Sequence, residues 1–252
     1  MHHGTPTTEE PAVHESVIVQ RLQRLHEEIV SLREAVLSMS TFVTERLTDQ
    51  DAIGPLTKQA WARSHPTPAL TWNTEMTGDA FLSRVRHHAG DDLGRLLEIG
   101  PGYGRLMEAI ARLGMKFSDY LGVDLSPASV AFLRERFGSD RVKYECADLF
   151  TFDAPKPRDT IVSSAVFLHL YPSIEPAMRR CRAMLRDGGR LFFDVLKGGT
   201  RYIHPVSRIF VRGYTPTELG EISQACGFRN CMIDHHENFA PGQPGWLVCA
   251  TA

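Results

Sequence analysis

The sequence lacks several features that would place the protein in a special class. It has no run of about 20 apolar residues, the length that a helix needs to cross a bilayer. Its N-terminal stretch MHHGTPTTEEPAVHE has no apolar core and therefore does not resemble a secretory signal. The formal charge of -2 over 252 residues argues against bulk electrostatic binding to nucleic acid or to an anionic membrane, although it leaves room for a local basic patch.

The chain also lacks any CxxC pair, the spacing that is typical of zinc and thiol redox sites. Its cysteines are odd in number and scattered, which favours reduced thiols over a disulfide framework. We therefore expect a cytoplasmic protein. The five cysteines are Cys146, Cys181, Cys226, Cys231 and Cys249.

The N-terminal part of the chain shows a helical repeat. Residues 1–14 are polar and are predicted to be disordered. Over residues 15–50, apolar side chains recur in alternating steps of four and three, which predicts one long helix that pairs with a second copy as a coiled coil. The same stripe would also serve a helix that folds back on its own domain. The repeat consists of Ile18, Leu22, Leu25, Ile29, Leu32, Val36, Met39 and Val43.

The rest of the chain divides into a connector and a larger domain. Residues 51–92 contain Gly54 and Pro55 and are predicted to be a connector that ends in a helix with Thr77 as its N-cap. From residue 93 to 252, strand and helix patterns alternate, with no visible repeat. Alternation of this kind predicts an α/β domain, doubly wound around a mostly parallel sheet with helices on both faces.

A glycine-rich loop follows the first predicted strand of this domain, in the sequence LLEIGPGYGRL at residues 96–106. Gly100, Gly102 and Gly104 allow tight turns and close approach of a ligand to the backbone. The spacing is not the dinucleotide fingerprint GxGxxG, because its third position is Arg105. No Gly-Lys-Ser/Thr follows, so the loop is not a Walker phosphate loop either.

Acidic residues lie at the ends of three consecutive predicted strands. Glu98 leads into the glycine loop, Asp124 ends the second strand beside Leu125, and Asp148 ends the third strand. A carboxylate at the second position can accept both hydroxyls of a ribose. Asp148 can accept a hydrogen bond from an exocyclic amine, and Leu149 offers an apolar wall to an adenine. Three acids would repel a diphosphate, so the set indicates a pocket for a neutral or cationic nucleoside.

Taken together, these motifs over residues 93–252 resemble the class I S-adenosylmethionine-dependent methyltransferases. LLEIGPGYG resembles the family's first motif, and Asp124 and Asp148 match its acidic residues after the second and third strands. The resemblance implies a Rossmann-like fold with seven strands, the last of them antiparallel, behind an N-terminal helical extension. It further implies S-adenosylmethionine as cofactor, S-adenosylhomocysteine as product, glycines beside the cofactor's amino-acid part, and Asp124 on the ribose.

The acceptor side is less specific in sequence. The segment SSAVFLHLYP, which begins at Ser163, lacks the Asn/Asp-Pro-Pro signature of enzymes that methylate base amino groups, so we expect a small-molecule acceptor methylated at oxygen. Such an acceptor needs a general base, and the two candidates are His169 and His204. The segment 197–215 is predicted to cover the pocket as a lid. We assign Ser164 to cofactor binding and Tyr171, Arg201 and Tyr202 to substrate binding.

Several alternatives remain at this point. Asp194 could join His235 or His236 around Mg²⁺, but nothing in the pattern fixes that geometry, and we assign no metal ligand. The protein could instead methylate RNA or protein, or be a coiled-coil scaffold whose methyltransferase-like domain is inactive. The sequence names neither the acceptor nor the oligomeric state.

Overall fold

The structure is a computed structural model that describes residues 19, 21–32, 36, 39, 50–64, 77–204, 209–236 and 244–252. The predicted disordered tail, residues 1–14, lies outside the described residues. The chain forms two compact units, Met1–Leu47 and Thr48–Ala252. Among the described residues, no helix is long and apolar enough to span a membrane.

The described part of the first unit is helical, as the apolar repeat predicts. Residues 21–32 form a continuous helix, and residues 19, 36 and 39 are helical as well. The side chains of the repeat are 52–68% exposed. Exposed apolar side chains at this spacing are suited to pairing with another helix. The described members of the repeat are Leu22, Leu25, Ile29, Leu32, Val36 and Met39.

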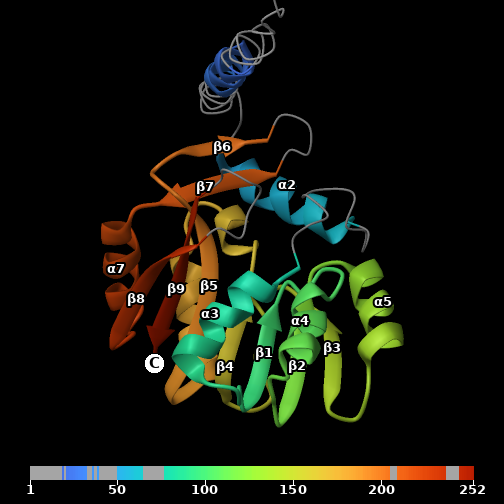
Figure 1. Cartoon of the computed structure of the whole chain (residues 1–252). Helices are drawn as coiled ribbons and strands as arrows, with labels where there is room; N and C mark the ends of the chain where they lie inside the picture. The colour runs from blue at the N-terminus through green and yellow to red at the C-terminus, as the bar shows by residue number, and fades with distance from the viewer. Residues whose placement is uncertain are drawn as a thin grey trace, which may run out of the picture. The chain divides into compact units, whose positions relative to one another are not determined.

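The second unit contains the predicted doubly wound sheet (Figure 1). Five strands run parallel in the order β3-β2-β1-β4-β5, and β9 pairs antiparallel with β5 and with β8. The antiparallel last strand is confirmed. These seven strands are β1 (Arg95–Ile99), β2 (Asp119–Asp124), β3 (Val142–Cys146), β4 (Arg158–Ser163), β5 (Leu185–Lys197), β8 (Asn230–His236) and β9 (Gly245–Thr251).

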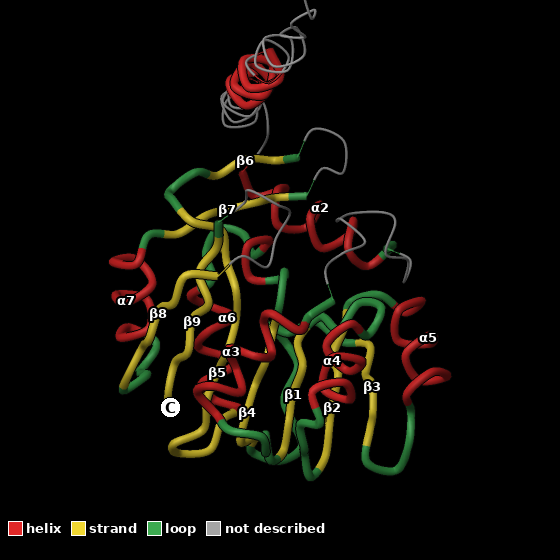
Figure 2. Tube along the Cα trace, viewed as in Figure 1, coloured by secondary structure: helices red, strands yellow, loops and turns green. Residues whose placement is uncertain are grey.

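Helices cover both faces of the sheet (Figure 2). Leu96 of β1 belongs to the same buried cluster as side chains of α3, α4 and α5, whereas Leu97 belongs to a cluster with side chains of α6 and α7. Adjacent strand residues thus face opposite layers, as the pleat of a strand requires. The helices are α3 (Asp79–Ala89), α4 (Arg105–Leu113), α5 (Pro127–Phe137), α6 (Glu175–Met184) and α7 (Pro216–Ala225).

Local sequence signals explain where two of these helices begin. The Ser126 hydroxyl accepts a hydrogen bond from Ser129 N at 3.1 Å, and Pro127 occupies the first turn of α5. Thr215 and Glu218 form a capping box at the start of α7. The predicted Thr77 cap of α3 is wrong, because the N-cap is Gly78 in the left-handed region, with no hydrogen bond from a capping side chain.

Two further elements lie beyond the carboxyl ends of the parallel strands, and the sequence analysis identifies neither (Figure 1). Helix α2 (Gln50–Ala62) occupies part of the predicted connector, with Pro55 inside it. A hairpin of β6 (Arg201–Ile203) and β7 (Phe210–Tyr214) occupies part of the predicted lid and extends the sheet to nine strands within the described residues. The Thr57 hydroxyl accepts a hydrogen bond from Phe210 N at 3.2 Å, which joins α2 to β7.

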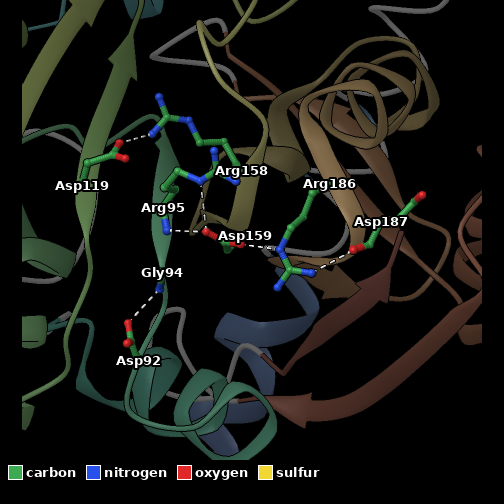
Figure 3. A network of polar contacts seen from close by, with 8 residues as sticks. All are labelled: Asp92, Gly94, Arg95, Asp119, Arg158, Asp159, Arg186 and Asp187. Atoms are coloured by element: carbon green, nitrogen blue, oxygen red, sulfur yellow. Dashed lines mark hydrogen bonds and ion pairs between the residues drawn. The ribbon is translucent and has the colours of Figure 1, made fainter.

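A network of ion pairs lies at the amino ends of the parallel strands, opposite the carboxyl ends (Figure 3). Asp159 accepts a hydrogen bond from Arg95 N at 2.7 Å and also pairs with Arg186, while buried Arg158 reaches Asp119 at 2.5 Å. These contacts join the first residues of β1, β2 and β4 to the start of β5. They lie at the end of the strands where parallel α/β sheets do not bind ligands, so we assign them a structural role.

Candidate functional site

A cavity of about 210 Å³ lies at the carboxyl ends of the parallel strands. The loops after β1, β2, β3 and β4 contribute to its wall, together with α2. This is the edge at which open α/β sheets bind ligands. Of the residues that the sequence analysis assigns, those lining the cavity are Gly100, Gly102, Asp124, Leu125, Asp148, Leu149, Ser164, His169 and Tyr171.

The glycine loop opens one side of the cavity. Gly100 has φ +70°, and a Cβ atom there would clash with the side chain of Val166, so the position requires glycine. Gly104 is different, because it does not line the cavity. A Cβ atom on Gly104 would clash with the ring of Phe137 in α5. The predicted role of Gly104 beside the cofactor is therefore revised to close packing between α4 and α5.

Asp124 joins the glycine loop to the start of α5. One carboxylate oxygen accepts a hydrogen bond from Gly102 N at 3.0 Å, and the other accepts from Ser126 N at 2.8 Å. Burial raises the pKa of Asp124, and the backbone N–H donors oppose that shift. The carboxylate is thus fixed in position at the wall of the cavity, with lone pairs left to accept further hydrogen bonds.

Asp148 is tied to helix α2. The Lys58 ammonium lies 2.7 Å from one carboxylate oxygen of Asp148, and the other oxygen accepts a hydrogen bond from Phe150 N at 3.0 Å. The same ammonium lies 4.4 Å from the centre of the Phe150 ring. Because both charges are partly exposed, this pair contributes little to stability, but it places α2 over the loop after β3.

Glu98 does not line the cavity, which corrects its assignment to the cofactor site. Its side chain is 2% exposed and accepts a hydrogen bond from the Tyr120 hydroxyl at 2.5 Å. Burial raises the pKa of Glu98 to about 7, against the opposing effects of the Tyr120 hydrogen bond and the Arg105 charge. Glu98 is therefore a structural acid inside the layer formed by α3, α4 and α5.

We expect the Glu98→Gln variant to be more stable than the wild type at alkaline pH. The folded pKa of about 7 exceeds the ordinary value of 4.5, so folding favours the protonated form. The raised pKa of Glu98 therefore contributes to the free energy of unfolding of the wild type. This contribution is at most roughly 3 kcal/mol, is fully present below pH 4.5, and is lost as the pH rises through 7. Gln cannot ionise, and its amide oxygen can still accept from Tyr120.

The measurement is urea unfolding of both proteins at pH 5.5 and pH 8. The stability difference between variant and wild type should grow with pH. Exposed Glu221→Gln is the matched control and should show no such trend. A Glu98→Gln protein that is less stable than the wild type at pH 8 would contradict this account.

Comparison with known proteins agrees with this geometry. Residues 97–191 match the profile of a family described as a methyltransferase domain. Ubiquinone biosynthesis O-methyltransferases are similar in sequence: the protein of Coxiella burnetii is 26% identical over 103 residues, and that of Xanthomonas campestris is 28% identical over 153 residues. The matched region spans 40% and 59% of this chain, and 43% and 61% of those relatives.

A solved structure of a DhpI–SAH complex shares the fold, with a TM-score of 0.62 and 20% sequence identity over 81% of this chain and 99% of the other. Residues 97–191 therefore match a methyltransferase domain, and the chain has the fold of S-adenosylmethionine-dependent methyltransferases. The matched profile runs from β1 into β5 and includes the glycine loop and the loops after β2, β3 and β4. It does not include the unit Met1–Leu47.

His169 lies in a 3-10 turn (Phe167–His169) at the wall of the cavity. Its Nδ1 is 2.8 Å from Phe210 O, and because a carbonyl only accepts, Nδ1 carries the proton and Nε2 carries a lone pair. Burial lowers the pKa of His169 to about 4, and the nearby His204 lowers it further, against the Phe210 hydrogen bond. The imidazole is therefore neutral at pH 7.

The structure does not bring the other predicted acceptor residues to the cavity. Arg201 and His204 are exposed at the β6–β7 hairpin, and Tyr202 packs against Leu168 and Val211 instead. The predicted lid segment forms a hairpin instead, and the lining of the cavity includes none of residues 201–204. Of the predicted substrate residues, the lining of the cavity includes Tyr171.

Helix α2 supplies residues that the sequence analysis misses. Thr57, Lys58 and Trp61 line the cavity, and the Trp61 ring lies 5.0 Å from that of His169. The spacing i, i+1, i+4 of these three residues is compatible with one helix face. This spacing was not recognised in the sequence, because a Gly-Pro pair such as Gly54-Pro55 is typical of a turn or a helix end rather than of a helix interior.

The predicted alternative of a metal site finds no support in the geometry. In the described part of the chain, no group of three or more His, Cys, Asp or Glu is arranged to hold a metal ion. Asp194 instead accepts hydrogen bonds from the Ser164 hydroxyl and from Ala165 N, each at 2.5 Å. The His235 ring packs against Trp246, and His236 Nε2 lies 3.8 Å from Asp194.

Proposed function

We propose that the protein transfers a methyl group from S-adenosylmethionine to an oxygen of a small-molecule acceptor. The observation that carries the proposal is that a fixed carboxylate, Asp124, and a glycine, Gly100, whose position excludes a side chain, line one cavity at the carboxyl edge of the sheet. A ribose with two hydroxyls fits the carboxylate, and a nucleoside fits between that loop and the loop after β3.

When bound, the cofactor supplies a methyl group on a positively charged sulfur. Asp124 would accept the ribose hydroxyls, and Asp148 with Leu149 would face the base. Gly100 and Gly102 would let the backbone approach the ligand closely. Helix α2, held by Lys58 and by the bond of Ser126 Oγ to Ser64 O at 2.7 Å, would exclude water from above.

The acceptor would occupy the part of the cavity lined by Trp61, His169, Leu170 and Tyr171. Aromatic and apolar walls favour a flat apolar acceptor such as a phenol. The neutral His169 offers a lone pair on Nε2 to the proton of its hydroxyl. The similarity to ubiquinone biosynthesis O-methyltransferases supports oxygen as the methylated atom.

Calorimetry with S-adenosylhomocysteine and a transfer assay with labelled S-adenosylmethionine test the proposal. We expect saturable binding of S-adenosylhomocysteine, and label in at least one member of a panel of phenols, catechols and sugars. No heat at millimolar ligand would overturn the proposal. Binding without transfer to any small molecule would favour a scaffold, and transfer to RNA or to a protein would replace the acceptor class.

We propose further that the helix containing residues 21–32 makes the protein a homo-oligomer through the exposed apolar repeat. A Leu25→Glu/Ile29→Glu protein should elute as a monomer in size-exclusion chromatography with light scattering, because two buried charges per helix oppose pairing. Glu27→Lys, at a position outside the repeat, is the control and should leave the oligomer intact. A double variant that keeps the wild-type mass would show that this repeat is not the interface.

A further inference from the structure

Helix α2 runs across the cavity from the part proposed for the acceptor to the part proposed for the cofactor (Figure 1). Just after the helix ends, Ser64 O accepts a hydrogen bond from Ser126 Oγ at 2.7 Å, and Ser126 N donates to Asp124. Nearer its other end, Gly54 lies against Tyr171. From Gly54 to its last residue the helix rises about 12 Å, at about 1.5 Å per residue. Gly54 therefore lies at the end of the cavity away from Asp124, the residue proposed to hold the ribose.

Gly54 gives the cavity a stretch of wall without a side chain. It lines the cavity together with Tyr171. A Cβ atom on Gly54 would lie 3.4 Å from Tyr171 Cδ1, which is an ordinary van der Waals contact, and within 4 Å it would meet no other atom of the described residues outside α2. A methyl group there would thus fit without a clash, and it would fill space beside the Tyr171 ring that glycine leaves open.

The wall between Gly54 and Trp61 is longer than one aromatic ring. Both residues line the cavity, and two turns of helix place them about 10 Å apart along the axis. Thr57 lies between them, and its hydroxyl already accepts a hydrogen bond from Phe210 N. Tyr171, beside Gly54, packs edge-on against Phe210, with ring centroids 5.1 Å apart. A wall of this length with an aromatic residue at each end favours a flat acceptor of two fused rings.

A glycine at this position also has a local explanation. Pro55 follows it, and inside a helix the proline ring crowds the Cβ atom of the preceding residue. Pro55 is exposed and does not line the cavity. It can therefore be replaced without changing the wall, so the local explanation can be tested apart from the one that concerns the cavity.

We propose that Gly54 is a specificity-determining residue for the acceptor, and that its bare backbone admits the second ring of a bicyclic phenol. This inference rests on the proposed function and names a narrower acceptor class for the same cavity. The hydroxyl to be methylated would lie on the ring nearer Trp61 and His169, which leaves the second ring for the space between Gly54 and Tyr171. A larger residue at position 54 would compete with the second ring and not with the cofactor, which would bind at the other end.

The test compares two acceptors that differ by one fused ring, catechol and naphthalene-2,3-diol. Transfer from labelled S-adenosylmethionine gives kcat/KM for each. The wild type should prefer naphthalene-2,3-diol by at least about 10-fold, because an apolar pocket discriminates by roughly 10- to 200-fold for each methylene group that it accommodates. Gly54→Ala should lose most of that preference. Its affinity for S-adenosylhomocysteine, measured by calorimetry, should equal that of the wild type.

Two further variants serve as matched controls. Pro55→Ala should keep the wild-type preference, and adding Gly54→Ala to it should again remove the preference, now without crowding by the proline ring. The double variant also decides if Gly54→Ala alone does not fold. Gly220 lies inside α7 and does not line the cavity, and a Cβ atom there would meet no atom of the described residues outside α7 within 4 Å. Gly220→Ala should behave as the wild type with both acceptors.

Three results with the variants would overturn the inference. The first is an unchanged preference in Gly54→Ala. The second is a preference that is lost in Gly54→Ala but kept in the double variant, because crowding by Pro55 would then explain the loss. The third is weaker binding of S-adenosylhomocysteine in Gly54→Ala, which would assign the residue to the placement of α2.

Failure of the inference is distinguishable from failure of the proposed function. A wild type that does not bind S-adenosylhomocysteine would overturn both. A wild type that methylates catechol at least as well as naphthalene-2,3-diol would overturn only the inference. A wild type that binds S-adenosylhomocysteine and methylates neither compound would also overturn the inference, while the other acceptors of the panel still test the proposed function.

Discussion

Replacing Asp124 by alanine is expected to weaken the binding of S-adenosylhomocysteine by about 10- to 100-fold, because a buried charged acceptor of hydrogen bonds is removed. The carboxylate lines the cavity and is positioned by Gly102 N and Ser126 N. Calorimetry gives the affinity. Thermal unfolding checks that the variant is folded.

The same carboxylate also holds the glycine loop, so the test must separate that effect from contact with the ribose. A ligand whose ribose lacks the 2′-hydroxyl provides the separation. The wild type should bind it less tightly than S-adenosylhomocysteine, and Asp124→Ala should discriminate less between the two. If the variant loses both ligands by the same factor, Asp124 supports the loop and does not contact the hydroxyl.

Glu145→Gln is the matched control for the loss of a negative charge at this edge. Glu145 is exposed on β3, paired in register with Val123, and does not line the cavity. The affinity of the Glu145→Gln variant for S-adenosylhomocysteine should equal that of the wild type. A comparable loss in Glu145→Gln would indicate a general electrostatic effect rather than a site at Asp124.

The parts of this fold that follow from local sequence were predictable. Alternating strand and helix patterns, together with caps such as Ser126-Pro127, give the parallel strands and the helices that cover them. Because the carboxyl ends of β1, β2 and β3 meet at one edge, Gly100, Asp124 and Asp148 were expected to share a pocket, and all three line one cavity.

Glu98 shows how far strand alternation could have predicted the site. Side chains alternate along a strand, so Glu98 shares a face of β1 with Leu96, whereas Leu97 and Ile99 share the other. Leu96 packs in the cluster with α3 and α4, and Glu98 enters the same layer at Tyr120. Alternation alone would not have excluded Glu98 from the site, because the adjacent residues Val123 and Asp124 both line the cavity. The buried contact with Tyr120 determines where Glu98 lies.

Other features could not be derived from local sequence, because they depend on distant contacts. Helix α2 contains Gly54 and Pro55, and Ile53 is buried in a cluster with Ile203 and Phe210 about 150 residues away. Arg105 looks like an ordinary helix residue until Ser164 lies beside it. Tertiary packing determines the helical state of α2 and the buried position of Arg105. Neither hydrophobic periodicity nor motif spacing predicts such packing.

The largest effect on turnover is expected for His169→Asn. Asparagine can keep the donor to Phe210 O while it removes Nε2, the nitrogen with the lone pair. We expect kcat to fall by about 10²- to 10⁴-fold, the usual contribution of a general base, with the affinity for S-adenosylhomocysteine changed little. Exposed His87→Asn is the control and should keep wild-type turnover.

The pH dependence gives an independent test of the same role. A base acts only when unprotonated, and burial lowers the pKa of His169 to about 4, so acidification should reduce kcat/KM only as the pH falls toward that value. An exposed histidine would instead give a fall near pH 6.5. The profile should therefore be flat from about pH 5.5 to 7 in the wild type, once acceptor ionisation is accounted for.

A base this weak is still sufficient for the proposed transfer. The acceptor oxygen becomes much more acidic as it gains a methyl group, so the proton passes readily to Nε2 late in the reaction. The neutral ring also keeps positive charge away from the methyl donor until that moment. A wild-type activity that falls through pH 6.5, or a His169→Asn protein with full turnover, would show that another group removes the proton.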